Sequence, residues 1–213
     1  MSRRSSGSVS TIIPCPRGGR NLGYKNTESS FGSVTKILHW TIAFCFLISY
    51  CSAYYGLWFT EDETYVNTIV IQIHQATGIV AAALVAVRVA WRLTSVLPNP
   101  PLASWYEHLA ARVVHAALYG VMIMMPVTGY FGTRRDTAFL GITRFDYTST
   151  WTSIEHAFDI SWDRFEAPLD YFHRDLGGPA IVWILIAIHI VGALYHHYHR
   201  RDDTLTRMLP TRR

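Results

Sequence analysis

Charged side chains are missing from four long stretches of the chain, and mostly apolar residues fill those stretches. Each stretch is 21 to 24 residues long, and together they cover residues 37–60, 64–87, 113–133 and 176–199. About 20 apolar residues, at a rise of about 1.5 Å per residue, cross the hydrocarbon core of a bilayer. Helices of a soluble bundle would instead carry a polar stripe. The pattern therefore predicts an all-α membrane protein, a four-transmembrane-helix bundle.

The residues that flank the stretches suggest bounds for the helices. We expect three spans near residues 33–59, 65–91 and 107–133, and a fourth that begins at Gly177–Gly178–Pro179, since proline suits the first turn of a helix. Residues 134–172 would then form a long external loop. Its many aromatic residues predict that it covers the outer ends of the helices, with a short helix near residues 153–158.

The domain organisation follows from these bounds. The bundle would occupy residues 33–200. A flexible basic tail of residues 1–32, rich in Ser, Gly and Arg, would precede it, and a basic tail of residues 201–213 would follow.

Charge placement predicts the orientation in the membrane. Only 16% of the 213 residues are charged, and the net charge is +4. Basic residues crowd both tails and the second connection, whereas residues 61–63 and the long loop are acidic. The positive-inside rule then places both termini in the cytoplasm. The arginines flank spans, so we expect lipid contacts and no nucleic acid partner.

Histidines are the unusual residues of the spans. Seven of the ten lie in or at the ends of predicted spans: His39, His74, His115, His173, His189, His196 and His197. Ionisable residues inside a membrane are functional by default and need a partner. Depth along the helices groups four of them into two layers, an inner pair (His39 and His189) and an outer pair (His74 and His173).

Two stacked metal cofactors would suit these pairs. Zinc prefers four side-chain ligands at one point, whereas haem supplies four equatorial nitrogens and needs only axial ligands. Gly78 and Gly192, close to two of the histidines, leave room for a flat ring. No C-x-x-C-H motif is present, so binding would be non-covalent. The alternative left open is that the histidines only hydrogen-bond to neighbouring helices.

Four segments resemble the bacterial cytochrome b561 family. They are "ILHWTIAF", "IHQATGIVAAALVAVRVAWRL", "VVHAALYGVMIMMPVTGY" and "IHIVGALYHHYHRRDDTLTRMLP", and the resemblance covers about residues 33–210. It implies a multi-pass protein of the bacterial inner membrane with two haem b groups, which passes electrons to or from ubiquinone. The implied axial ligands are His39, His74, His173 and His189. The family includes superoxide oxidases, so superoxide or a redox protein is the expected external donor.

One spacing departs from the family pattern. The two ligands of the fourth span are commonly about 14 residues apart, close to four turns of α-helix, whereas His173 and His189 are 16 apart. At about 100° per residue, 16 residues point the two side chains about 160° apart. We expect a break at Gly177–Gly178–Pro179 that places His173 on a turn before the helix. His156 in the external loop is the alternative ligand.

Other polar residues lie near the predicted cofactors. Arg88, Arg92, His196 and His197 would either anchor the inner interface or bind haem propionates or the quinone head group. His115 is expected to be structural, or to bind a propionate or quinone, without ligating iron. Arg134 and Arg135 could attract a superoxide anion.

Two other functions remain open. One is a cytochrome b membrane anchor that relays electrons within a larger dehydrogenase or hydrogenase complex. The other is a non-redox membrane protein with structural histidines. Copurification of a soluble partner would indicate the first, and a colourless protein would indicate the second.

Overall fold

The computed structural model describes residues 23–62, 64–101, 103–132, 137–139, 143–145 and 147–210. Within these residues, four helical segments are long and apolar enough to cross a membrane. They are α1 (Ser33–Phe59), α2 (Tyr65–Thr94), α3 (Trp105–Phe131) and a continuous run over Trp162–Arg200. The predicted four-helix bundle is confirmed, and the first three spans agree with the expected bounds to within three residues.

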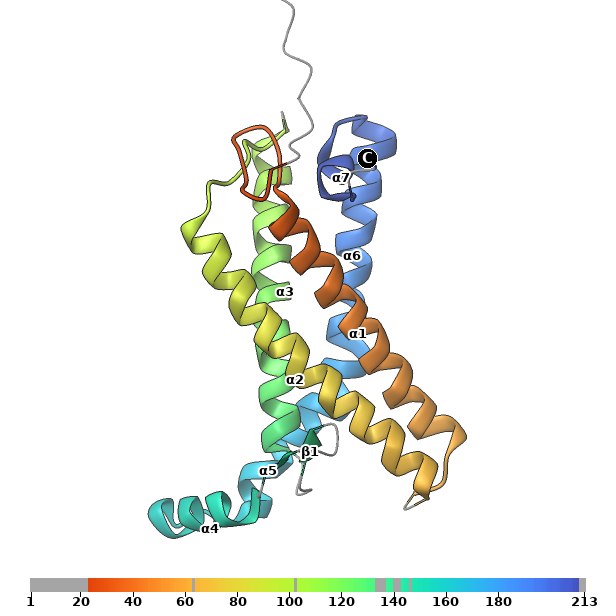
Figure 1. Cartoon of the computed structure of the whole chain (residues 1–213), viewed down its shortest axis with the longest axis vertical. Coiled ribbons are helices and arrows are strands. Elements are labelled where there is room, and N and C mark those ends of the chain that lie inside the picture. Colours follow the sequence, from red (N-terminus) through yellow and green to blue (C-terminus); the bar gives the residue numbers. More distant parts are fainter. Residues whose placement is uncertain are drawn as a thin grey trace, which may run out of the picture.

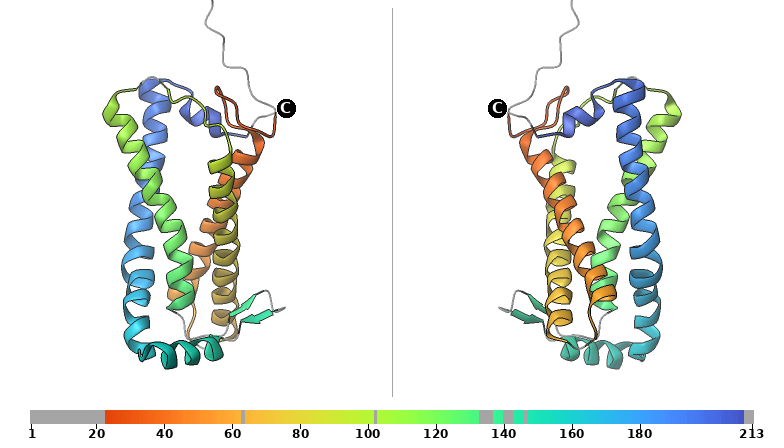
Figure 2. Two further views of the ribbon diagram at one scale, coloured as in Figure 1. Left: turned by 90° about the vertical axis from the view of Figure 1, so that its left-hand side faces the viewer. Right: turned by 90° about the vertical axis from the view of Figure 1, so that its right-hand side faces the viewer.

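The four helices form two layers. α1 and α2 pack along each other, and α3 packs against α6 (Val182–Tyr195) of the fourth span (Figure 1). The two layers are seen edge-on in Figure 2. Side chains such as Phe44, Leu47 and Val191 point outward and are more than half exposed. A helix bundle with this apolar outer surface needs lipid around it, because lipid tails remove these side chains from contact with water.

Local capping explains where the helices begin. The Thr64 hydroxyl accepts a hydrogen bond from the Asn67 backbone N–H at the start of α2. Ser104 and Glu107 form a reciprocal capping box at the start of α3, in which the Ser104 N–H donates to the Glu107 carboxylate at 2.7 Å. Both arrangements satisfy backbone N–H groups that have no partner within the helix.

The fourth span does not begin at Gly177–Gly178–Pro179, and this prediction was wrong. The helix runs without interruption from α5 (Trp162–Asp170) through a π-helical segment, η1 (Tyr171–Ile181), into α6 and then η2 (His196–Arg200). Proline disrupts an α-helix because its ring meets the carbonyl four residues earlier. The i→i+5 ladder of a π-helix widens the turn. Pro179 therefore lies inside the helix, and His173 is a helical residue.

The segment between α3 and the fourth span lies at one end of the bundle. It contains a short antiparallel pair, β1 (Thr137–Phe139) and β2 (Thr143–Phe145), and then α4 (Tyr147–Phe158). α4 runs roughly perpendicular to the spans (Figure 2) and projects to the side of the bundle beyond the end of α3 (Figure 1). The short helix expected near residues 153–158 is thus confirmed.

Aromatic side chains explain why this segment folds back on the bundle. Trp151 and Trp162 are buried against each other, with ring centroids 4.1 Å apart. Phe165 of α5 and Phe131 at the end of α3 complete the cluster. The aromatic residues therefore form a small core at the mouth of the bundle, as their number in the sequence predicted.

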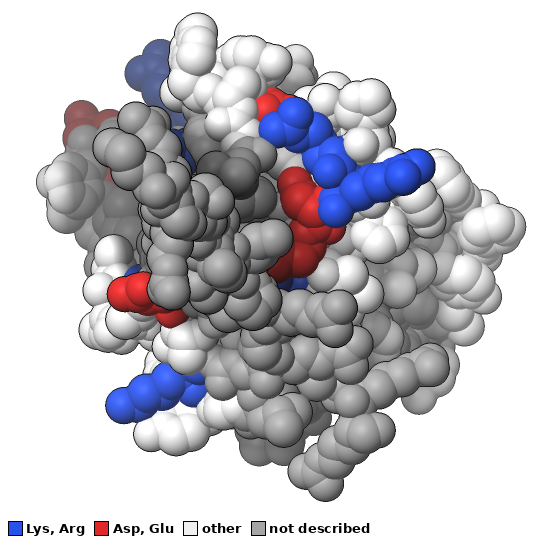
Figure 3. Space-filling view, turned by 90° about the horizontal axis from the view of Figure 1, so that it is seen from above, with Lys and Arg blue, Asp and Glu red and all other residues white. Residues whose placement is uncertain are grey.

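The opposite end carries the segments that precede and follow the bundle. In residues 23–32, the Asn26 side chain accepts hydrogen bonds from the Gly32 N–H and the Thr35 hydroxyl, which ties this part of the expected flexible tail to α1. The short helix α7 (Thr204–Met208) folds back beside it. Seen from this end, acidic and basic side chains lie side by side (Figure 3). The positive-inside rule predicts that this end faces the cytoplasm.

Candidate cofactor site

The outer histidine pair joins α2 to the π-helical segment. The imidazole rings of His74 and His173 have centroids 5.9 Å apart. Nδ1 of His74 donates to the Ser49 carbonyl at 2.9 Å, and Nδ1 of His173 donates to the Met125 carbonyl at 2.9 Å. Each ring therefore keeps Nε2 available. A backbone carbonyl on one ring nitrogen is the usual arrangement that orients a histidine whose other nitrogen binds a metal.

α3 is shaped to accept the ring of His173. A Cβ at Gly129 would lie 2.6 Å from Cε1 of His173, closer than any ordinary contact. The neighbouring Thr128 is fully buried, and its hydroxyl lies 3.4 Å from Nδ1 of the same ring. Glycine at 129 is thus required for the approach of His173 to α3.

The inner group contains three histidines from three helices. The ring centroids of His39 on α1 and His189 on α6 are 6.1 Å apart, and those of His115 on α3 and His189 are 5.4 Å apart. Trp40 packs edge-on against His39, with centroids 5.3 Å apart. The structure thus brings together the two pairs that depth along the helices predicted, and it adds His115 to the inner pair.

The separations within the two pairs suit one metal ion between two rings. Nitrogen ligands bind a metal at about 2 Å, so two imidazoles on opposite sides of one ion have centroids about 6 Å apart. His74 with His173 and His39 with His189 meet this condition, whereas His115 lies too close to His189. Within the described residues, no group of three or more His, Cys, Asp or Glu side chains is arranged to hold a metal ion.

Haem fits this donor set better than a bare ion. Two axial imidazoles are all that a haem iron requires from the protein. A Cβ at Gly78, one turn from His74, or at Gly192, one turn from His189, would meet nothing within 4 Å. This open space lies beside one ligand candidate of each pair, as a flat macrocycle needs.

Arg88 and Arg92 converge on one tyrosine of α3. Nε of Arg88 donates to the Tyr119 hydroxyl at 3.1 Å, and its Nη1 donates to the Thr35 carbonyl at 3.2 Å. The guanidinium of Arg92 lies over the Tyr119 ring, 5.9 Å from its centroid. Arg88 is also close enough to His39 to interact with it electrostatically. A cation is thus held beside the inner histidines.

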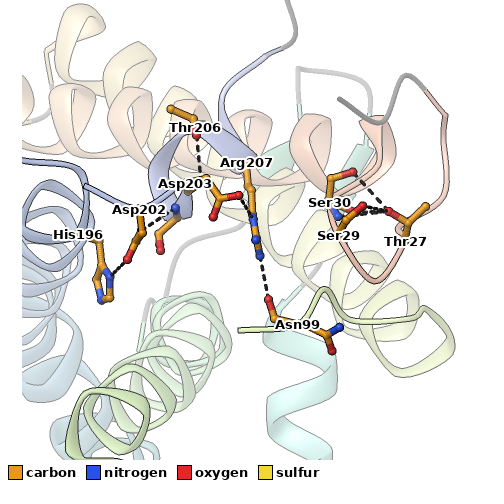
Figure 4. Close-up of polar contacts among 10 residues, drawn as sticks. Thr27, Ser29, Ser30, Asn99, His196, Asp202, Asp203, Thr206 and Arg207 are labelled. Carbon is orange, nitrogen blue, oxygen red and sulfur yellow. Dashed lines mark hydrogen bonds and ion pairs between the residues drawn. The ribbon is translucent and has the colours of Figure 1, made fainter. Parts of the chain in front are cut away.

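The two predicted histidines near the end of the fourth span have different surroundings. Nδ1 of His196 lies 2.6 Å from the Asp202 carboxylate (Figure 4), whereas the ring of His197 packs edge-on against Tyr198. Burial alone would raise the pKa of the Asp202 carboxyl. Hydrogen bonds from Thr204 and His196 outweigh burial and leave that pKa below its usual value.

α7 closes over this end through a chain of polar contacts. Arg207 pairs with Asp203 at 2.8 Å and donates to the Asn99 carbonyl at 2.8 Å (Figure 4). The indole N–H of Trp40 donates to the Met208 carbonyl at 2.9 Å. Trp40, which follows His39 on α1, therefore links α1 to the segment that follows the last span.

Some predicted residues stay apart from the pairs. His156, the alternative ligand, is exposed on α4. Arg134 and Arg135 lie outside the described residues.

Sequence reasoning missed several residues that position the histidines or Arg88. They are Ser49, Thr35, Tyr119, Gly129 and Asp202. Helical spacing gave a signal for two of them, because Thr35 precedes His39 by four residues and Tyr119 follows His115 by four. The carbonyls of Ser49 and Met125 left no signal, because any residue supplies a backbone carbonyl.

Four membrane helices with two opposed histidine pairs define a class of bundle suited to non-covalent haem. A sequence model described as prokaryotic cytochrome b561 matches residues 30–211. The chain belongs to this family, and it is accordingly a multi-pass electron-transfer protein of the bacterial inner membrane, with haem b implied as the cofactor.

Individual relatives span most of the chain. It is 29% identical over 192 residues to cytochrome b561 homolog 2 of Escherichia coli (strain K12), which covers 88% of this chain and 95% of the relative. It is 27% identical to cytochrome b561 homolog 1 of the same organism, over 86% of this chain and 98% of the relative. It is also 27% identical to the probable superoxide oxidase CybB of Yersinia pestis, over 66% of this chain and 75% of the relative.

Proposed function

We propose that the chain is a di-haem cytochrome b in which each histidine pair holds one haem b. The outer haem would be held by His74 and His173, and the inner haem by His39 and His189. The observation that carries the proposal is the separation of the two pairs, 5.9 Å and 6.1 Å between ring centroids. Both values suit two axial imidazoles on one iron.

The second support is the difference between the histidines that pair and those that do not. The outer rings are oriented through Nδ1 by the carbonyls of Ser49 and Met125, which leaves Nε2 for iron. His115 lies beside the inner pair but too close to His189 for an opposed ligand. We therefore assign it a supporting position at the inner haem.

Haem b, when bound, takes up and releases one electron at a time. The chain's part is to hold two such groups at different depths, through ligands on one continuous helix. His173 and His189 are 16 residues apart, which at an α-helical rise puts the two levels at most about 24 Å from each other along the helix axis. Electrons would thus cross the membrane between an external donor and ubiquinone.

Arg88 is the residue best placed to bind an anionic group at the inner haem. Tyr119 and Thr35 hold its guanidinium at two nitrogens. Its remaining N–H groups have no partner among the residues that the structure describes, and we propose that they donate to a propionate carboxylate or to a quinone oxygen. Arg92, His196 and His197 are proposed to line the same end.

The proposed external donor is superoxide. The support is the likeness to a probable superoxide oxidase. Two superoxide anions would each lose one electron to become dioxygen. One ubiquinone would gain both electrons and two protons to become ubiquinol. This proposal requires the α7 end to face the cytoplasm and the α4 end to face outward.

The test is a reduced-minus-oxidised absorption spectrum of the detergent-purified protein, with haem quantified per chain. We expect two b haems in the wild type and one in each of His173→Ala and His39→Ala. Superoxide-dependent reduction of a ubiquinone analogue would then test the donor. A protein that stays colourless after incubation with haem would contradict the proposal and indicate structural histidines. A soluble dehydrogenase or hydrogenase that copurifies would indicate the membrane-anchor function.

A further inference from the structure

His173 and His189 face the same side of the fourth span, although their spacing forbids this on an ordinary α-helix. Sixteen α-helical residues would leave the two side chains about 160° apart. In the structure the ring of His173 reaches His74 on α2, and the ring of His189 reaches His39 on α1. Since α1 and α2 form one layer (Figure 2), both rings point toward the same layer.

The π-helical segment η1 supplies the missing rotation. The N–H of Val182 donates to the Gly177 carbonyl, five residues earlier. An i→i+5 ladder takes nearly one more residue per turn, so each residue turns by about 80° where an α-helical residue turns by about 100°. Half of the steps from His173 to His189 lie in η1. The 16 residues therefore complete about four whole turns, and the two rings return to one face.

Two glycines allow the backbone to take this form. A Cβ at Gly177 would lie 2.6 Å from the Phe172 carbonyl oxygen, and a Cβ at Gly178 would lie 2.7 Å from the His173 carbonyl oxygen. Both distances are shorter than real Cβ atoms show, and both obstacles are backbone atoms five residues earlier. Any side chain at either position would have to push those carbonyls away.

Two neighbouring features stabilise the same segment. Pro179 has no N–H, so one carbonyl of the preceding turn is released from an α-helical ladder. The Tyr50 hydroxyl of α1 donates to the Gly178 carbonyl at 2.9 Å. The segment is thus held from α1 at Gly178, next to Pro179.

We propose that Gly177 and Gly178 are positioning residues that keep η1 in the π form and so bring His173 onto the face of His189. This inference rests on the proposed di-haem function, because the outer ligand is what the glycines position. A side chain at these positions would return the segment toward an α-helix and turn His173 away from His74.

The experiment combines a substitution with a compensating deletion. The double variant Gly177→Ala, Gly178→Ala should lose the outer haem and bind one haem per chain. Deletion of residues 177 and 178 shortens the spacing to about 14 residues, nearly four α-helical turns, and should bind two haems. Leu176→Ala is the matched control, because it lies in the same segment and adds no Cβ; it should keep two haems.

The readouts are haem per chain, the reduced α-band and the low-temperature EPR signals of the two ferric haems. Two haems with wild-type EPR signals in the double variant would overturn the inference and leave the proposed function intact. One haem in the deletion variant would also overturn the inference. This second test holds even if the double variant fails to fold. A wild type without haem would refute the proposed function instead.

Discussion

Gly129→Ala tests whether the packing of His173 against α3 positions it as the outer ligand. A Cβ at this position would lie 2.6 Å from Cε1 of His173, whereas ordinary contact begins at 3.4 Å, so the ring must retreat by about 0.8 Å. Metal–nitrogen distances vary by about 0.2 Å. The retreat would also lengthen the 2.9 Å bond from Nδ1 to the Met125 carbonyl.

The expected magnitude follows from the cost of overpacking. Inserting a methyl group into a packed site costs about 1–3 kcal/mol, which corresponds to roughly 5- to 150-fold weaker haem binding if the strain acts on the ligand. We expect the outer haem to be lost in part or to lose its low-spin character, while the inner haem stays unchanged. The assay is haem titration of apoprotein, followed by EPR of the loaded protein.

Gly120→Ala is the matched control on the same helix. Gly120 is exposed, and a Cβ there meets nothing within 4 Å. It should bind both haems as the wild type does. If Gly129→Ala binds two low-spin haems with wild-type affinity, the packing of His173 against α3 does not set the outer ligand, and the reasoning fails.

Three further predictions separate ligands from structural residues. His115→Ala should keep two haems and shift the midpoint potential of only the inner one in a redox titration; a loss of one haem would make His115 a ligand. Asn67→Ala removes a partly buried 2.8 Å hydrogen bond to the Thr60 hydroxyl and should lower the free energy of unfolding by about 1–2 kcal/mol, seen as a lower melting temperature with haem content unchanged. Asp202→Asn should destabilise the protein by about 1 kcal/mol at neutral pH. Because the folded pKa of Asp202 is lowered from 3.8, its stabilisation is present above that value and is lost as the pH falls through the folded pKa. The melting temperatures of wild type and Asp202→Asn should therefore converge as the pH falls through the folded pKa, and a difference that persists in acid would contradict this account.

The sequence alone determined the bundle and the pairing by depth. A bilayer core has a set thickness, so the length of each charge-free stretch limits where a helix can begin and end. Alternating helix direction then orders His39, His74 and His189 by depth without any knowledge of packing. The aromatic residues of the connecting segment likewise predicted a covered bundle end, because buried Trp151 and Trp162 need a core to pack into.

Only the tertiary structure decided how His173 meets the outer pair. Spacing with α-helical geometry placed it on the wrong face, and a helix break at Gly177–Gly178–Pro179 was the only local remedy visible in the sequence. The chain takes another solution, a π-helical turn stabilised by Tyr50 from a different helix. The orienting carbonyls of Ser49 and Met125 were hidden for the same reason, since contacts between distant segments depend on how helices pack and leave no local pattern.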